Sequence, residues 1–259
     1  MNLKQQLEYH YKEFDKNQIA PDPLEFLHLY RQPLDIEAMG VIAAVFAYGN
    51  VKQINNTLEK IRIAADNKPY QFVYNFDKSS ARKLNGIMHR FYTNDDIIQF
   101  FFTLKYIYRE YGSLKNFFYQ FYDASAENLK STISSFSTGF YDVMKNVAIK
   151  KNISPGIKFM FPLPELGSAC KRTNLFLRWM IRKDELDFGL WDKIPASKLI
   201  IPVDTHVARV CAFLKLTERK NPGWKMAEEI TNKLKKFDAD DPVKYDFAIC
   251  HIGMRKIKF

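Results

Sequence analysis

The sequence predicts an all-α protein. Apolar residues recur with the spacing of a helix face in nearly every segment of the 259 residues. Glycine and proline number only 10 and 11, fewer than the turns of a barrel or sandwich require. Apolar residues make up 47% of the chain, enough to fill a sizeable core. We therefore expect helices joined by short loops, in one or two lobes.

In the first half, three features predict where helices lie. Asp22 followed by Pro23 is typical of a helix start. Residues 35–50 are apolar on almost every side, so this helix is expected to be central and buried. Thr93 with Asp96 forms a capping-box pattern. The expected helices are 2–14, 22–30, 35–50, 51–67, 93–112, 113–122 and 126–148.

The second half opens with a junction. Residues 149–169 hold three prolines and two glycines, a composition typical of a loop between lobes. We expect 1–259 to form a single unit, in which 30–150 are mainly the central helical lobe and 151–259 carry a hairpin-like segment and the C-terminal helices. The helices expected beyond the junction are 168–182, 204–216, 224–237 and 241–254.

The net charge and the cysteines indicate which partners and which cellular compartment to expect. The chain has 39 basic and 29 acidic residues, a net charge of +10, which favours nucleic acid or a membrane surface as partner. None of the three cysteines lies in a C-x-x-C pair, so a cysteine-ligated metal cluster is not expected. The sequence shows no signal peptide and no run of 18 apolar residues. We therefore expect a cytoplasmic protein with no membrane partner.

Asp204 stands at the entrance of a helix, in "IPVDTHVARVCAFLKL". Apolar residues from Val207 onward fall on one face of that helix. Capping alone explains an aspartate there and is worth about 1 kcal/mol. A carboxylate held in this way can also serve chemistry, and both interpretations stay open. His206 has no carboxylate at the spacing of a metal site, so we expect a structural role for it and no metal.

The helix before Asp204 carries a basic face. On a helical wheel Lys171, Arg178 and Arg182 fall within about 40° of one another, with Arg172 at their flank. Such a face could lie along a phosphate backbone, or it could be a solvated surface. The tight turn at Gly167 is expected to present backbone N–H groups to an anion.

These two segments resemble a known superfamily. "IPVDTHVARVC" is similar to the signature that follows the hairpin in the helix-hairpin-helix DNA glycosylases, which include endonuclease III and 8-oxoguanine glycosylase. "LPELGSACKRTNLFL" resembles their hairpin, although Glu165 stands where a first glycine is usual. The C-terminal half resembles more closely the bacterial DUF2400 family, whose chains carry "GSACKR", "PVDTHV" and "DPVKYDFA". Lys171 and Asp204 are 33 positions apart, farther than in endonuclease III, and the archaeal 8-oxoguanine glycosylases carry a comparably long insertion.

The resemblance implies a fold, a reaction and a partner. The fold would be glycosylase-like, with two helical lobes and a cleft between them. Lys171 would attack C1′ of a flipped-out nucleotide, displace a damaged base such as an oxidised purine, and nick the strand through a Schiff base, and Asp204 would stabilise the cationic sugar or relay a proton. The partner would be double-stranded DNA in the nucleoid, without an iron–sulfur cluster, another cofactor or an obligatory protein partner. Residues expected to bind DNA are Gly167, Ser168, Arg172, Arg178 and Arg182.

Other residues have two interpretations each. Tyr48, Asn50 and Gln53 follow the long buried helix, where the superfamily places residues that fill the gap left by the flipped base; they could instead be turn and core residues. Asp246 could read the base edge, or pair at the surface with Lys244 or Arg255. The whole chain also has alternatives: a DNA-binding protein that kept the fold without the chemistry, or a helical protein whose basic surface binds a protein or RNA.

Overall fold

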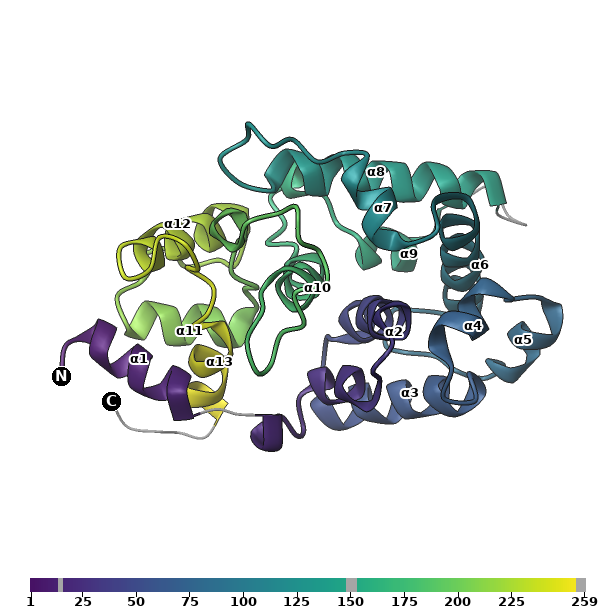
Figure 1. Cartoon of the computed structure of the whole chain (residues 1–259), viewed down its shortest axis with the longest axis horizontal. Helices are drawn as coiled ribbons and strands as arrows, with labels where there is room; N and C mark the ends of the chain where they lie inside the picture. The colour runs from purple at the N-terminus through teal and green to yellow at the C-terminus, as the bar shows by residue number, and fades with distance from the viewer. Residues whose placement is uncertain (14–15, 148–152, 255–259) are drawn as a thin grey trace. The chain divides into compact units, whose positions relative to one another are not determined.

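The computed structural model describes residues 1–13, 16–147 and 153–254 (Figure 1). Its regular elements there are all helices, so the all-α prediction is confirmed. The only β-type pairings among these residues are two isolated bridges, His89–Tyr92 and Lys183–Phe188. The chain forms two compact units. Unit 1 comprises Met1–Ile19, Ala124–Ser131 and Leu163–Phe259, and unit 2 comprises Ala20–Asp123 and Thr132–Pro162.

Unit 2 is built around one buried helix. Helix α2 (Pro33–Phe46) is buried at every residue from Ile36 to Phe46, as its apolar sequence predicts. The carboxylate of Glu37, within this helix, accepts hydrogen bonds from the backbone N–H groups of Leu114 and Lys115 and so caps helix α7. Helix α2 packs against η2 (Pro23–Leu29), α3 (Val51–Ala64) and α4 (Pro69–Tyr74). The unit also contains α5 (Lys78–Lys83), α6 (Asn94–Tyr111), α7 (Leu114–Tyr119), most of α8 (Lys130–Val147) and α9 (Pro155–Met160).

The helix ends in unit 2 follow the predicted signals. Asp22 caps η2 by accepting a hydrogen bond from the N–H of Leu24. The capping box of Thr93 and Asp96 is present at the start of α6. This helix ends at Gly112, whose φ of 75° is one that glycine adopts without strain. Part of the expected junction after residue 149 is helical, because Ser154 caps α9.

Unit 1 carries the two motifs that the sequence singled out. Its elements are α1 (Leu3–Glu13), η1 (Lys16–Gln18), η3 (Pro164–Leu166), α10 (Lys171–Ile181), η4 (Ala196–Lys198), α11 (Thr205–Phe213), α12 (Trp224–Lys235) and α13 (Asp246–Met254). Helix α13 packs against both α11 and α1 (Figure 1). Within the described ranges, none of the helices has the length and hydropathy needed to span a bilayer.

Candidate functional site

Lys171 and Asp204 lie at the starts of two helices of unit 1. Asp204 caps α11, because its Oδ1 accepts hydrogen bonds from the N–H groups of His206 and Val207, both at 2.9 Å. Its Oδ2 lies 3.9 Å from Nζ of Lys171, the first residue of α10. The lysine side chain is 27% exposed and the aspartate side chain 40%. One oxygen therefore holds the helix, while the other faces an amine that solvent can reach.

The backbone just before Lys171 is tightly constrained. Cys170 has a φ of 47°, in the left-handed region, and its N–H donates to Ser168 Oγ at 3.1 Å. The side-chain amide of Asn174 donates to the carbonyl oxygen of Ala169 at 3.0 Å. Burial raises the pKa of the Cys170 thiol to about 12. This thiol therefore stays protonated at neutral pH and does not compete with the lysine as a nucleophile.

The turn before α10 differs from the expected anion cradle. The N–H of Leu166 donates to Leu163 O, and the N–H of Gly167 donates to Pro164 O at 2.9 Å. Gly167 adopts a φ of 85°, and its carbonyl oxygen accepts the N–H of Trp224 at the start of α12. The N–H groups of Leu166 and Gly167 are thus used within the 3-10 turn, and a contact of Gly167 with DNA stays a prediction. The Ser168 hydroxyl, also expected to bind DNA, accepts the N–H of Cys170.

The basic face predicted for α10 is not at the surface. Arg172, Arg178 and Arg182 are only 7%, 3% and 4% exposed, so the prediction that they line a phosphate-binding face is wrong. The prediction failed because a helical wheel assumes that the side of the helix opposite the apolar stripe faces water. In the fold, the segment after α10 turns back over that side and donates the Phe188 N–H to Trp179 O.

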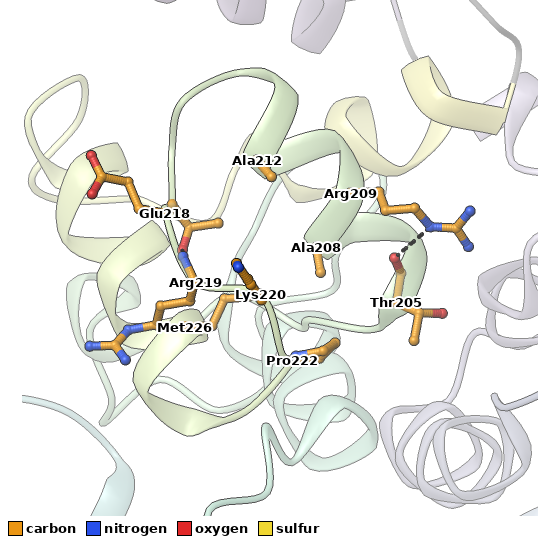
Figure 2. A pocket seen from close by; sticks show the side chains of 10 residues that line it. Thr205, Ala208, Arg209, Ala212, Glu218, Arg219, Lys220, Pro222 and Met226 are labelled. Atoms are coloured by element: carbon orange, nitrogen blue, oxygen red, sulfur yellow. Dashed lines mark hydrogen bonds between the residues drawn. The ribbon is translucent and has the colours of Figure 1, made fainter.

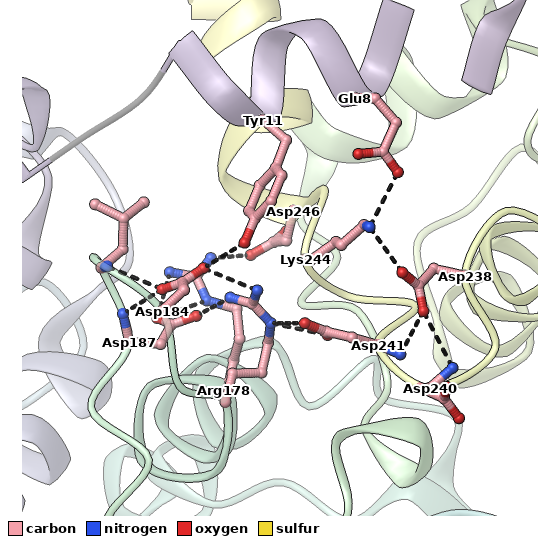
Figure 3. Close-up of polar contacts among 12 residues, drawn as sticks. Glu8, Tyr11, Arg178, Asp184, Asp187, Asp238, Asp240, Asp241, Lys244 and Asp246 are labelled. Atoms are coloured by element: carbon pink, nitrogen blue, oxygen red, sulfur yellow. Dashed lines mark hydrogen bonds and ion pairs between the residues drawn. The ribbon is translucent and has the colours of Figure 1, made fainter. Parts of the chain in front are cut away.

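Four carboxylates surround two of these arginines (Figure 3), and two of the four, Asp187 and Asp246, are buried. Arg178 donates to Asp246 and lies 3.3 Å from Asp187. Arg182 bonds Asp187 as well, together with Asp184 and Asp241 at 2.9 and 2.8 Å. Burial acts to lower the pKa of the Arg182 guanidinium, but the carboxylates outweigh it and the pKa is raised. We call this set, Arg178, Arg182, Asp184, Asp187, Asp241 and Asp246, the ion network.

Asp246 connects the ion network to the candidate site. The alternative of a surface pair with Lys244 is wrong, because Asp246 is buried and bonds Arg178, whereas Lys244 bonds Asp238 and Glu8. Arg255, the other partner considered, lies outside the described residues. Burial raises the pKa of Asp246 to about 6, against the opposing effect of Arg178 and Lys171. Asp246 is thus a second carboxylate electrostatically coupled to Lys171, on the buried side of the site.

Comparison with known proteins places the chain in a family. A family model described as protein of unknown function (DUF2400) matches residues 22–255. The chain belongs to the DUF2400 family. No curated protein and no solved structure is similar enough to count as a match.

A groove of the DUF2400 protein begins at Thr205, the residue after Asp204 in the chain (Figure 2). Its volume is about 580 Å³, and it runs along α11 to the loop before α12. Arg209 donates to Thr205 O, Arg219 pairs with Glu229 at 3.0 Å, and Lys220 is exposed. The lining residues are Thr205, Ala208, Arg209, Ala212, Thr217, Glu218, Arg219, Lys220, Pro222 and Met226. The sequence interpretation missed this groove, because its cations are scattered over a helix and a loop rather than stacked on one face.

The residues expected to fill a base gap lie in unit 2. Asn50 caps α3 by accepting the N–H of Lys52, and Gln53 is exposed on the first turn of that helix. Tyr48 is half-buried, and its hydroxyl donates to His89 O and accepts the N–H of Phe91. Tyr48 and Asn50 therefore have the turn and packing roles of the second interpretation. Their contribution to base recognition in this DUF2400 protein stays a prediction.

His206 makes a contact between helices. One nitrogen of its ring, Nε2, lies 3.1 Å from the carbonyl oxygen of Cys250, which connects α11 to α13. This agrees with the structural role expected from the sequence. In the described part of the DUF2400 chain, no three His, Cys, Asp or Glu side chains gather as metal ligands would.

Proposed function

We propose that this chain is a DNA glycosylase with AP lyase activity, acting on double-stranded DNA that contains a damaged base. One observation carries the proposal: the Lys171 amine lies 3.9 Å from an Asp204 oxygen that is not used in capping. The resemblance of "LPELGSACKRTNLFL" and "IPVDTHVARVC" to the glycosylase motifs, and the net charge of +10, support it. A glycosylase-like fold with two lobes and a cleft is part of the same proposal.

The proposed reaction needs only protein side chains. The target nucleotide leaves the base stack, because its glycosidic bond cannot be reached inside the duplex. The neutral amine of Lys171 attacks C1′, and the base departs with the electron pair of the glycosidic bond. Loss of a proton from nitrogen and opening of the sugar ring give a Schiff base, and removal of a C2′ proton then expels the 3′ phosphate. In the proposed reaction, Asp204 Oδ2, which lies 3.9 Å from the amine, stabilises the cationic sugar and accepts the ammonium proton.

The groove beside Asp204 suits a strand that leaves the site. It starts at Thr205, and its rim carries the exposed side chain of Lys220. Cations at such a rim provide sequence-independent affinity for phosphates. This groove replaces the buried arginines of α10 as the proposed phosphate contact of unit 1.

Borohydride trapping tests the proposal directly. The intact chain is mixed with duplexes that carry an abasic site, an oxidised purine or another lesion, and sodium borohydride reduces any Schiff base to a stable adduct. We expect an adduct with at least one duplex and none with Lys171→Gln. Lys236→Gln, at an exposed lysine just beyond α12, is the matched control and should retain full trapping. An adduct that persists in Lys171→Gln would assign the nucleophile to another residue.

A non-catalytic DNA-binding protein is the second candidate. The departure from the glycosylase hairpin favours it, because Glu165 stands where a first glycine is usual in the enzymes. Such a protein would bind duplex DNA with steep salt dependence, yet give no adduct and no cut strand with any lesion.

A further inference from the structure

Unit 2 carries a cluster of exposed aromatic and apolar side chains. Phe91 is 63% exposed and its neighbour Met88 69%. The Phe91 ring stacks on Tyr48, with centroids 6.3 Å apart and planes 12° from parallel. It also meets the edge of Phe159, with centroids 5.7 Å apart. We call Tyr48, Met88, Arg90, Phe91 and Phe159 the aromatic platform.

Backbone hydrogen bonds hold the Phe91 loop in place. His89 and Tyr92 exchange two backbone bonds, of 3.1 and 2.9 Å, which closes a tight turn with Arg90 and Phe91 at its tip. The Tyr48 hydroxyl bonds both sides of the tip, through His89 O and the Phe91 N–H. The exposed ring of Phe91 is therefore on a fixed loop, so little conformational entropy remains to be lost on binding.

Helix α9 is held against the same loop. A side chain at Gly156 would place its Cβ 2.8 Å from Phe91 O and 2.5 Å from Asp96 Oδ2, so this approach requires glycine. The Ser154 hydroxyl donates to Asp96 at the start of α6. These two contacts bring Phe159 beside Phe91.

A cation completes the platform. The guanidinium carbon of Arg90 lies 5.7 Å from the ring centroids of both Tyr48 and Phe91. Gly49 makes room for it, because a Cβ there would lie 2.7 Å from Arg90 Cδ. The three segments that form the platform, 47–50, 88–91 and 158–159, contain Arg90 and Lys158 and no carboxylate.

We propose that the aromatic platform stacks on unpaired bases of single-stranded nucleic acid, with Arg90 contacting the strand's phosphates. Exposed rings combined with cations are the features by which proteins hold single strands without reading their sequence. An apolar protein partner would not account for a guanidinium held over the exposed rings, whereas a single strand offers bases to the rings and phosphates to Arg90. The inference rests on the proposed function only for the nucleic-acid class of the partner, since it makes no use of Lys171.

The test uses the intact chain and a short thymine-rich oligonucleotide that contains one 2-aminopurine. We expect the single strand to bind more tightly than the matched duplex, and the 2-aminopurine fluorescence to be quenched by stacking. Phe91→Ala should weaken single-strand binding about tenfold and remove the quenching, because one stacked base contributes about that much. Phe91→Trp should preserve both. Ile63→Ala is the matched control, since Ile63 is 64% exposed in the same unit and should not affect either signal.

Three outcomes would overturn the inference. The first is equal affinity for the single strand and the duplex. The second is unchanged single-strand binding in Phe91→Ala. The third is a loss of single-strand affinity in Ile63→Ala as large as that in Phe91→Ala. If Phe91→Ala instead changed only self-association or protein binding, the platform would be a protein-docking surface. Lys171→Gln separates this test from the glycosylase proposal, because it should abolish trapping and leave the quenching intact. If no duplex gave a trapped adduct but the quenching remained, the glycosylase proposal would be excluded and single-strand binding by the aromatic platform would still be supported.

Discussion

The guanidinium of Arg178 donates to the carboxylate of Asp246, which comes 68 residues later in the chain. The same guanidinium lies 3.3 Å from Asp187, so a single buried cation serves two buried acids. The pairing fixes the start of α13 against α10, the helix that Lys171 begins. Energetically the pair is asymmetric. Losing the cation leaves Asp246 without its ion-pair partner and leaves Asp187 with Arg182 alone, whereas losing one carboxylate leaves Arg178 with the other.

Replacing Arg178 tests this asymmetry. Arg178→Met should lower the free energy of unfolding by about 3–5 kcal/mol, because it leaves Asp187 and Asp246 buried without their shared cation. Urea denaturation at pH 7 measures the change. Arg209→Met is the control, because Arg209 is exposed and donates to a carbonyl oxygen of its own helix, so a change within about 0.5 kcal/mol is expected. Equal losses in the two variants would show that the network contributes no specific stability.

The ionisation of Asp246 gives the stability a defined pH dependence. Its pKa is raised from 3.8 to about 6 in the folded chain, so between these values the folded state binds more protons than the unfolded state. Its contribution is therefore greatest at low pH and falls as pH rises from about 4 to about 6. The stability of the native chain relative to Asp246→Asn should decline over this window, as measured by urea denaturation at several pH values. Asp184 has the opposite sign, because its pKa is lowered and its contribution is lost in acid. A carboxyl NMR titration of Asp246 with a midpoint near 4 would contradict the prediction.

The two oxygens of Asp204 should be separable by mutation. Asp204→Ala removes the cap of α11 and should cost about 1 kcal/mol of stability, whereas Asp204→Asn keeps a capping oxygen and should cost a few tenths. Both variants remove the negative charge beside Lys171, so both should slow borohydride trapping at least tenfold. Ser113→Ala removes the hydroxyl that accepts the Asn116 N–H at the start of α7 in unit 2, and it should lower stability while leaving the trapping rate unchanged. Full activity in Asp204→Asn would restrict Asp204 to a structural role.

The groove should account for part of the salt dependence of DNA binding. Lys220→Gln should lower the slope of log K against log salt concentration by about one, the effect of losing one phosphate contact. The affinity should fall to a similar extent for duplexes of unrelated sequence, measured by fluorescence anisotropy. Lys236→Gln, placed at the other end of α12, is the control. An unchanged slope in Lys220→Gln would place the phosphate path elsewhere.

Local signals in the sequence predict local structure well. The burial of α2, the cap at Asp22 and the capping box of Thr93 follow from neighbouring residues alone, and the structure confirms them. The cap formed by Asp204 is of the same kind. Its approach to Lys171 is not a local property, and only the resemblance to the glycosylases suggested it.

The sequence interpretation failed where distant segments decide the environment. A helical wheel shows Arg178 and Arg182 opposite the apolar stripe, but it cannot show that acids 59 and 68 residues away will cover them. The aromatic platform was missed for a similar reason. Phe91 lies in a loop without periodicity, and its exposure depends on a turn closed by His89 and Tyr92.

Helix α1 lies outside the range matched by the family model but contacts residues inside it. The family match starts at residue 22, yet Glu8 bonds Lys244 and Tyr245, and Tyr11 donates to Asp184 of the ion network. A recombinant protein trimmed to the matched range would lose these contacts and expose the groups that α1 covers. The family match thus leaves out a helix that belongs to unit 1, and a recombinant protein for these experiments should include α1.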